Sequence, residues 1–126
     1  RMIERKPRPG TTILGSGWQL MFTVDNKRAY IDVKDKITVG RDMQKDGSVD
    51  FDLNEFGAYH FGVSRHHANL NMIDSLIYLE DNNSTNGTRI NGFQLTPHQQ
   101  YRLRDGDELE FGRLRIKITF MKPGSQ

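Results

Sequence analysis

The sequence contains no cysteine, so neither a disulfide framework nor a thiolate metal site holds the chain together. It also has no apolar run of about 18 residues and no charged-then-apolar leader, so we expect no membrane span and no secretion signal. Internal repeats, low-complexity segments and convincing helical periodicity are missing as well. The 126 residues suffice for one domain with its own core, and we expect it in the cytoplasm.

The formal net charge is +2, and the basic residues are unevenly placed. They cluster at the start of the chain, at Arg1, Arg5, Lys6 and Arg8, and elsewhere alternate with Asp and Glu. Aromatic residues are scattered rather than grouped as a stacking platform for bases. This pattern favours a basic linker over a duplex-binding surface. Binding of nucleic acid or of an acidic partner through the basic arm is the alternative function.

Short alternating segments follow one another at regular spacing. Strands are predicted over 18–24, 28–33, 36–41, 68–73, 76–80, 88–90, 93–95, 108–111 and 113–120, with a brief one at 49–53. Asn91-Gly92 has the residues of a type I′ hairpin, in which both central positions need φ > 0. These features predict an antiparallel β-sandwich. We expect a flexible arm or linker over 1–17, the folded domain over 18–121 and a tail over 122–126.

Polar residues gather where predicted strands meet loops, at 39–41, 62–68 and 82–88. A loop next to a strand is a rigid place to hold a binding group. A phosphate dianion requires positive charge and several fixed donors, because water solvates it well. Arg41 supplies charge and a forked set of donors, and Ser64 supplies a compact hydroxyl. Arg65, or the backbone N–H groups beside it, can close such a site.

Four short motifs carry a family resemblance: Gly40-Arg41, Ser64-Arg65-x-His67, Asn86-Gly87 and Asn91-Gly92. In this order and spacing they resemble the forkhead-associated (FHA) domain, as found in bacteria, over about residues 18 to 120. The resemblance implies an FHA/SMAD-like sandwich of two sheets with its binding loops at one end. It also implies a non-catalytic phosphothreonine-binding module of Ser/Thr kinase signalling, without a cofactor. The expected partner is a protein or peptide that carries phosphothreonine, such as a Ser/Thr kinase or its substrate.

The same resemblance assigns ligand contacts to individual residues. Arg41 and Ser64 match phosphate-contacting positions, and Arg65 matches a variable position that often contacts the phosphate or the peptide. Thr85 and Asn86 match the loop that faces the ligand, where the Asn amide bonds the peptide backbone. Arg89 is a further candidate contact with the peptide.

Five other residues are expected to support the site rather than to touch the ligand. His67 matches a position that braces the binding loops by hydrogen bonding. Gly40 is expected to permit a close backbone approach, whereas Gly87 and Gly92 are expected to take φ > 0. Asn91 is expected to shape its hairpin.

Residues 42–61 depart from the family pattern because this segment is long. It carries Phe56, Tyr59, His60 and Phe61. These aromatic side chains either form a wall that recognises a residue after the phosphothreonine or pack inward within a plain insertion. Some relatives recognise an acidic residue of the ligand through a basic group shortly before the serine. In this chain that place is taken by Gly62, which puts the acidic preference in doubt.

Other functional classes find little support in the sequence. His66 and His67 would point to opposite faces of a strand, so with His60 they do not predict a metal site. No G-x-S-x-G elbow and no phosphate-binding loop is present, so no catalytic site is predicted. Two alternatives stay open. One is a phosphate-independent protein-interaction domain, and the other is a self-bound phosphothreonine at Thr11 or Thr12.

Overall fold

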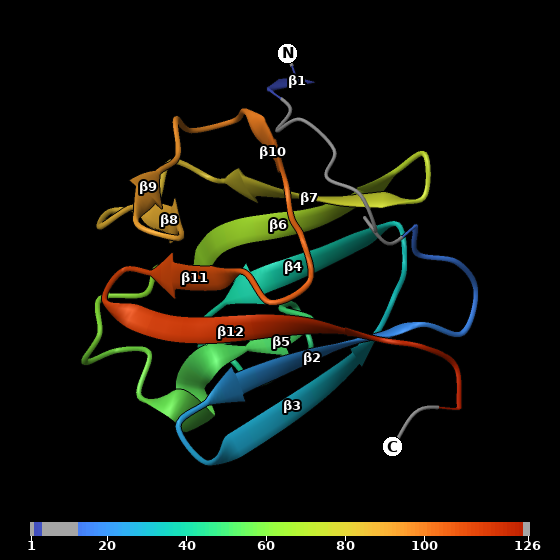
Figure 1. The fold of residues 1–126 in the computed structure, drawn as a ribbon. Helices are drawn as coiled ribbons and strands as arrows, with labels where there is room; N and C mark the ends of the chain where they lie inside the picture. Colours follow the sequence, from blue (N-terminus) through green and yellow to red (C-terminus); the bar gives the residue numbers. More distant parts are fainter. Residues whose placement is uncertain (1, 4–12, 125–126) are drawn as a thin grey trace.

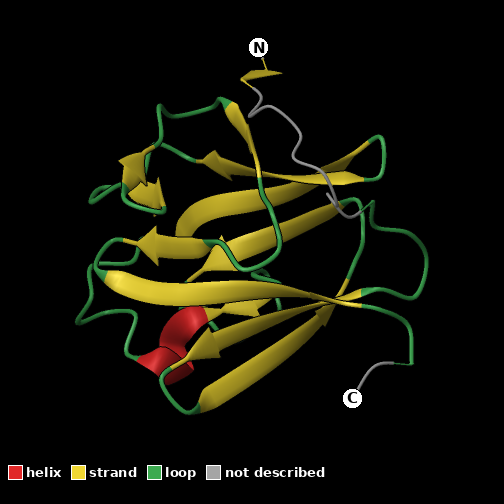
Figure 2. Cartoon of the chain, viewed as in Figure 1, coloured by secondary structure: helices red, strands yellow, loops and turns green. Residues whose placement is uncertain are grey.

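The computed structural model describes residues 2–3 and 13–124, which form two packed β-sheets (Figures 1 and 2). The first sheet has the strand order β1-β10-β7-β6-β4-β5 and the second has the order β3-β2-β12-β11-β8-β9. One turn of 3-10 helix, η1 (Leu53–Phe56), is the helical element of the described residues. The predicted two-sheet sandwich is therefore confirmed.

The strands of each sheet come from distant parts of the chain. The first sheet contains β1 (Met2–Ile3), β10 (Gln100–Arg102), β7 (Leu76–Asp81), β6 (His66–Ile73), β4 (Lys36–Gly40) and β5 (Phe51–Asp52). The second contains β3 (Lys27–Asp32), β2 (Gln19–Val24), β12 (Leu114–Met121), β11 (Glu108–Phe111), β8 (Thr88–Ile90) and β9 (Phe93–Gln94). Among these described pairings, β1 with β10 and β4 with β5 are parallel and the others are antiparallel.

The core lies between the two sheets and follows from the alternation of each strand. In β2 and β12 every second side chain is buried, as expected for strands with one face on a core. Phe22 of β2 stacks on Phe51 of β5 with ring centroids 4.3 Å apart, so the two sheets meet through aromatic rings. A fully buried side chain of this size contributes about 1.5–3 kcal/mol.

All of the predicted strands are present, several with ends shifted by one or two residues. The strand β10 and the short β1 that pairs with it were not predicted. Leu14 is 2% exposed and its N–H donates to the carbonyl of Ser75 at 2.8 Å, so the core includes a residue ahead of Trp18. Thr11 and Thr12, and the basic residues at positions 1, 5, 6 and 8, lie outside the described residues.

The Asn91-Gly92 turn has the backbone that its sequence predicts. Asn91 has φ of 49° and Gly92 has φ of 84°, the two positive values of a type I′ hairpin. The Asn91 side chain also donates to Asp107 Oδ1 at 2.9 Å and accepts from the Glu108 N–H at 2.9 Å. It therefore ties this hairpin to the start of β11.

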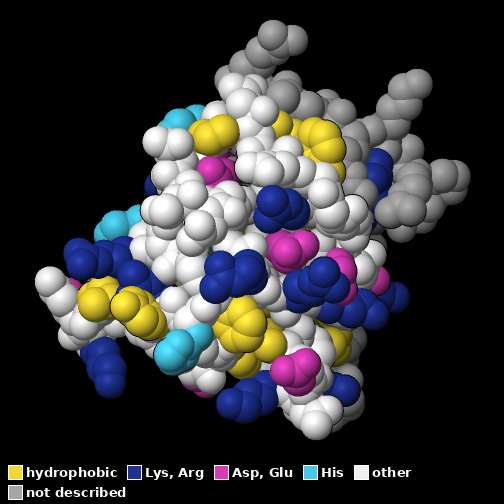
Figure 3. All heavy atoms as spheres, turned by 90° about the vertical axis from the view of Figure 1, so that its left-hand side faces the viewer, with side chains coloured by type: hydrophobic (Ala, Val, Ile, Leu, Met, Phe, Trp, Pro, Cys, Tyr) yellow, Lys and Arg dark blue, Asp and Glu magenta, His cyan; other side chains and the backbone are white. Residues whose placement is uncertain are grey.

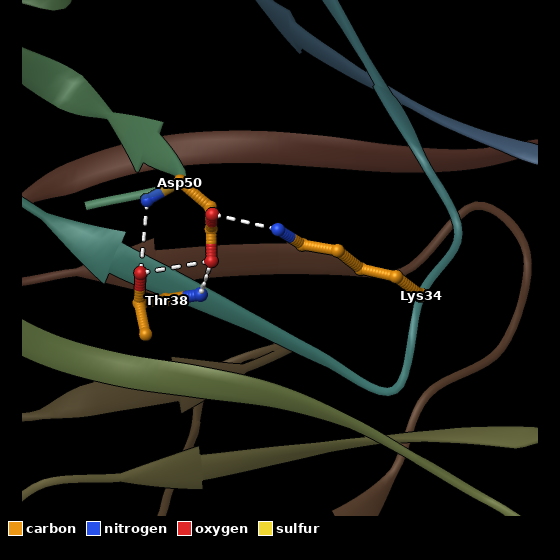
Figure 4. A network of polar contacts seen from close by, with 3 residues as sticks. All are labelled: Lys34, Thr38 and Asp50. Carbon is orange, nitrogen blue, oxygen red and sulfur yellow. Dashed lines mark hydrogen bonds and ion pairs between the residues drawn. The ribbon is translucent and has the colours of Figure 1, made fainter. Parts of the chain in front are cut away.

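The first part of the long segment after Arg41, ahead of β5, is held by aspartate side chains. Asp42 is buried, and its carboxylate accepts the N–H groups of Lys45 at 2.8 Å and Gly47 at 3.0 Å. Asp50 accepts from the N–H and the hydroxyl of Thr38 and from Lys34, at 2.7 to 3.0 Å (Figure 4). The Asp42 bonds close the start of the segment into a turn, and the Asp50 bonds with Thr38 attach its other end to β4.

Gly40, the last residue of β4, lies directly against the chain that enters β6. A Cβ placed on Gly40 would overlap the carbonyl oxygen of Arg65, and this same oxygen accepts the N–H of Arg41 at 3.1 Å. The close backbone approach expected at Gly40 is thus present. It brings the Arg41 and Ser64 loops together.

We predict that Gly40→Ala destabilises the fold, because the added methyl group must displace backbone. Urea unfolding should show a loss of about 2–3 kcal/mol in the free energy of unfolding. Gly15→Ala is the matched control, since no heavy atom lies within 4 Å of a Cβ at Gly15. Its expected change is within about 0.5 kcal/mol. Equal stability of the two variants would contradict the close approach.

No helix in the described part of the chain has the length and apolar character needed to cross a membrane.

Candidate functional site

Loops from three parts of the chain surround a hollow at one end of the sandwich. These loops lie on the left of Figure 1, the side of the molecule that faces the viewer in Figure 3. We call it the first hollow. Its volume is about 490 Å³, and it is lined by Arg41, Tyr59, His60, Gly62, Val63, Ser64, Thr85 and Asn86. The structure therefore brings together four of the predicted ligand-contacting residues, from the loops after β4, before β6 and after β7.

Arg41 is fixed before any ligand arrives. Its Nε donates to the Val63 carbonyl at 2.6 Å, and its guanidinium carbon lies 5.4 Å from the centre of the Tyr59 ring. The Nη1 group also contacts the sulfur of Met43 at 3.0 Å. A guanidinium that is already oriented loses less side-chain entropy when it binds an anion, which favours tight binding.

Ser64 joins two of the loops and keeps one hydrogen-bonding group available. Its Oγ accepts the N–H of Thr85 at 3.1 Å, and its own N–H donates to His67 Nδ1 at 2.9 Å. Because the backbone N–H of Thr85 already occupies one lone pair of the Ser64 oxygen, the hydroxyl hydrogen points elsewhere. In this position it can donate to an anion in the first hollow.

His67 is fully buried and connects the Ser64 loop to the loop that follows β7. Its Nδ1 accepts from Ser64, so Nε2 carries the hydrogen and donates to the Gly87 carbonyl at 2.9 Å. The ring also meets Phe111 edge-on at 5.6 Å. Burial lowers the pKa of His67, against the opposing effects of the Gly87 hydrogen bond and of the Asp81 charge. The imidazole is therefore neutral at pH 7.

Asp81, which the sequence analysis did not single out, organises the loop that carries Thr85 and Asn86. This carboxylate is 2% exposed and accepts from the hydroxyls of Ser84 at 2.5 Å and Thr88 at 2.6 Å. It also accepts the Ser84 N–H at 3.2 Å. An Asp at a strand end with a Ser three residues later is typical of such a turn, so the signal was present in the sequence.

Asn86 and Gly62 form a close contact that explains the glycine before Val63. Asn86 Nδ2 donates to the Gly62 carbonyl at 2.9 Å, and a Cβ on Gly62 would lie 2.5 Å from that nitrogen. Gly62 also has φ of 75°. A basic residue at this position would therefore be strained and would displace the Asn86 amide.

The aromatic segment combines the two interpretations that its sequence allowed. Phe56 packs inward against Phe51, whereas Tyr59 is 74% exposed and lines the first hollow with His60. The exposed part is held by Arg113, whose Nη2 donates to the His60 carbonyl at 2.8 Å. No local pattern indicated Arg113, because it lies 53 residues further along the chain than His60.

Two of the predicted contact residues do not line the first hollow. Arg65 is exposed and lines a second hollow, described below. Arg89 lies on β8, and its Nη2 donates to Gln94 Oε1 of β9 at 3.2 Å. Gly87 has φ of 85°, as expected, and its carbonyl accepts from both His67 and the Gly112 N–H. Within the described residues, no group of three or more His, Cys, Asp or Glu could hold a metal ion.

The profile of the FHA domain family matches residues 37–112, which contain this site. The chain therefore belongs to the FHA domain family. Among curated proteins, it is similar to FraH of Nostoc sp., at 41% identity over 59 residues. That match covers 47% of this chain but 20% of FraH, so the chain spans a small part of this relative.

Solved FHA structures resemble the whole sandwich. One comes from an analysis of phosphothreonine-dependent FHA domain interactions, with 26% identity and a TM-score of 0.63 over 83% of this chain and 98% of the other. The FHA domain of FhaA, solved with the intracellular domain of another protein, has 26% identity and a TM-score of 0.62, over 80% and 98%. An FHA domain of Arabidopsis thaliana shares the fold at 22% identity and a TM-score of 0.69, over 97% and 99%.

We predict that stability falls as the pH drops below about 6.5, because of His67. Its pKa is lowered from the usual 6.5 in the folded protein, so the unfolded chain takes up the proton first. The stabilisation that neutral His67 contributes is complete above about pH 6.5, and it is lost as the pH falls toward the lower pKa that His67 has in the folded protein. Urea unfolding between about pH 7.5 and 5 measures this slope, above the range where carboxylates titrate.

His67→Gln should be less stable than wild type at pH 7.5 and should lose much of the pH slope. His66→Gln is the matched control, because His66 is the exposed neighbour at the start of β6. It should leave both the stability and the slope near wild type. A slope that persists in His67→Gln and disappears in His66→Gln would refute the assignment.

Proposed function

We propose that this domain binds phosphothreonine-containing segments of proteins, with the phosphate in the first hollow. The observation that carries the proposal is the convergence of the Arg41 guanidinium and the Ser64 hydroxyl on one hollow, each already held by backbone groups. Membership of the FHA family and the similarity to a domain with phosphothreonine-dependent interactions support it.

The expected contacts follow from the donors of the first hollow. Arg41 supplies the positive charge with its Nη groups, which do not bond to the backbone carbonyl that holds Nε, and Ser64 supplies a neutral O–H donor. Each charge-assisted hydrogen bond contributes about 1.5–3 kcal/mol net, so two or three favour the phosphorylated ligand by several kcal/mol. That difference is large enough for binding to depend on phosphorylation.

Recognition of the peptide itself falls to the loop that follows β7. Thr85 and Asn86 are exposed and line the same hollow as Arg41. The Asn86 amide donates one N–H to the Gly62 carbonyl. Its side-chain oxygen and its second N–H can then pair with the N–H and C=O groups of an extended peptide.

The biological role that we propose is non-catalytic capture in Ser/Thr kinase signalling. The ligand would be a phosphorylated kinase or one of its substrates, and the cytoplasm is the compartment where such ligands arise from ATP-dependent phosphorylation. The sites contain donors that bind an anion, and we assign no bond-breaking step to them.

We predict that Arg41→Ala reduces affinity for a phosphothreonine peptide by about 50-fold or more, because one strong charged contact is lost. Fluorescence anisotropy with a degenerate phosphothreonine library measures this loss. Unphosphorylated peptides should not bind, and phosphoserine peptides should bind about fourfold more weakly, the contribution of one buried methyl group. Arg28→Ala, a charge loss on the outer strand β3, is the control.

Wild-type protein that binds phosphorylated and unphosphorylated peptides equally would contradict this function. Binding that survives Arg41→Ala, disappears when residues 1 to 10 are deleted and falls steeply with salt would instead indicate an anionic partner of the basic arm.

We also predict that Asn86→Ala lowers affinity for the phosphothreonine peptide by about 10-fold, while the preference for phosphorylated over unphosphorylated ligand persists. The reason is that Asn86 is assigned to the peptide backbone and not to the phosphate. Isothermal titration with the best library peptide and with its unphosphorylated form separates these effects. Loss of phosphate discrimination in Asn86→Ala would show that its assignment is wrong.

A further inference from the structure

A second hollow also involves Arg41. Its volume is about 240 Å³, and it is lined by Arg41, Met43, Gln44, Asp46, Ser48, Arg65 and His66. Arg41 is the residue that lines both hollows, so the two hollows adjoin one another at this side chain. Figure 3 shows Lys, Arg and His side chains gathered on this end of the molecule.

The second hollow is rich in hydrogen-bond donors. Besides the two guanidinium groups of Arg41 and Arg65, it presents the Gln44 amide, the Ser48 hydroxyl and the His66 imidazole. Asp46 is the one carboxylate of this lining, and it accepts the Ser48 N–H at 3.0 Å. Two permanent positive charges against one negative charge make the second hollow a suitable place for an anion.

The walls of this hollow are well supported. The segment that carries Gln44, Asp46 and Ser48 wraps around the buried Asp42 carboxylate, which accepts three of its backbone N–H groups. Arg65 is anchored on the opposite side, because its carbonyl oxygen accepts the Arg41 N–H against Gly40. The donors of the second hollow therefore stand on two braced segments.

We propose that the second hollow binds a second anionic group of the same ligand, either another phosphate or a carboxylate side chain near the phosphothreonine. Arg65 then acts on this second group and not on the phosphothreonine itself. The inference rests on the proposed function, since the phosphothreonine in the first hollow positions the second anion. It makes the domain selective for multiply phosphorylated or acid-flanked sites.

The test uses one phosphothreonine peptide and two matched series derived from it. In one series a phosphoserine is placed at each position within four residues on either side, and in the other a glutamate is placed there. Affinities are measured by isothermal titration for wild type, Arg65→Ala and Arg28→Ala, at low and high salt. The single-phosphate peptide reports the first hollow, and the difference between peptides reports the second.

At one or two positions we expect the second phosphate to raise wild-type affinity about 10-fold and glutamate about 3-fold. Salt should reduce both gains. Arg65→Ala should remove the gain and change affinity for the singly phosphorylated peptide by less than about twofold, whereas Arg28→Ala should preserve the gain. The two series show whether phosphate or carboxylate is the preferred second anion.

A second variant tests the hollow without removing a cation. Asp46→Asn takes away its carboxylate, so affinity for the doubly phosphorylated peptide should rise about threefold while the singly phosphorylated peptide is unaffected.

Three results would overturn the inference while the proposed function stands. These are no gain at any position, an unchanged gain in Arg65→Ala, or equal weakening of singly and doubly phosphorylated peptides by Arg65→Ala. Wild-type protein that binds no phosphothreonine peptide would overturn the proposed function together with the inference.

Discussion

The buried imidazole of His67 is the constraint on which the binding end depends. One ring nitrogen accepts from the Ser64 backbone and the other donates to the Gly87 carbonyl, so one neutral side chain fixes the distance between two loops. The bond from Thr85 to the Ser64 hydroxyl oxygen adds a second link between the same loops. Protonation of His67 would remove the acceptor for Ser64, and burial opposes that change. Binding geometry and fold stability therefore depend on the same neutral ring.

Arg41 is the charged group on which anion binding depends, as loop geometry depends on His67. A backbone carbonyl and an aromatic ring hold its guanidinium, and Arg41 lines both the phosphothreonine site and the second anion site that we propose. Gly40 makes this placement possible, because any side chain there would push the Arg65 carbonyl away. The arginine is thus useful because of the glycine before it. A cation on a loose loop would bind the same anion with a larger entropic cost.

The sequence was informative where local chemistry decides the structure. Strand alternation predicted the sandwich, and Asn91-Gly92 predicted its hairpin, since each depends on neighbouring residues. Contacts between distant residues were not predictable in this way. Arg113 supports the aromatic segment through a carbonyl 53 residues away, and Arg65 adjoins Ser64 in sequence yet faces a different hollow. Side chains alternate along a strand, so adjacent residues such as Ser64 and Arg65 are expected to point to opposite sides. Which of the two sides meets a given loop depends on tertiary packing, which the local sequence does not reveal.

The central claim is that phosphothreonine is held at the junction of three loops by groups already in place. The most direct test is a two-dimensional proton–nitrogen NMR titration of the intact chain with a short phosphothreonine peptide. We expect the largest shifts at the Arg41 Nε–H, the Ser64 and Thr85 amides and the Asn86 side-chain amide, with small shifts elsewhere in the strands. Saturable shifts that leave these four groups unmoved and cluster on another face of the sandwich would contradict it.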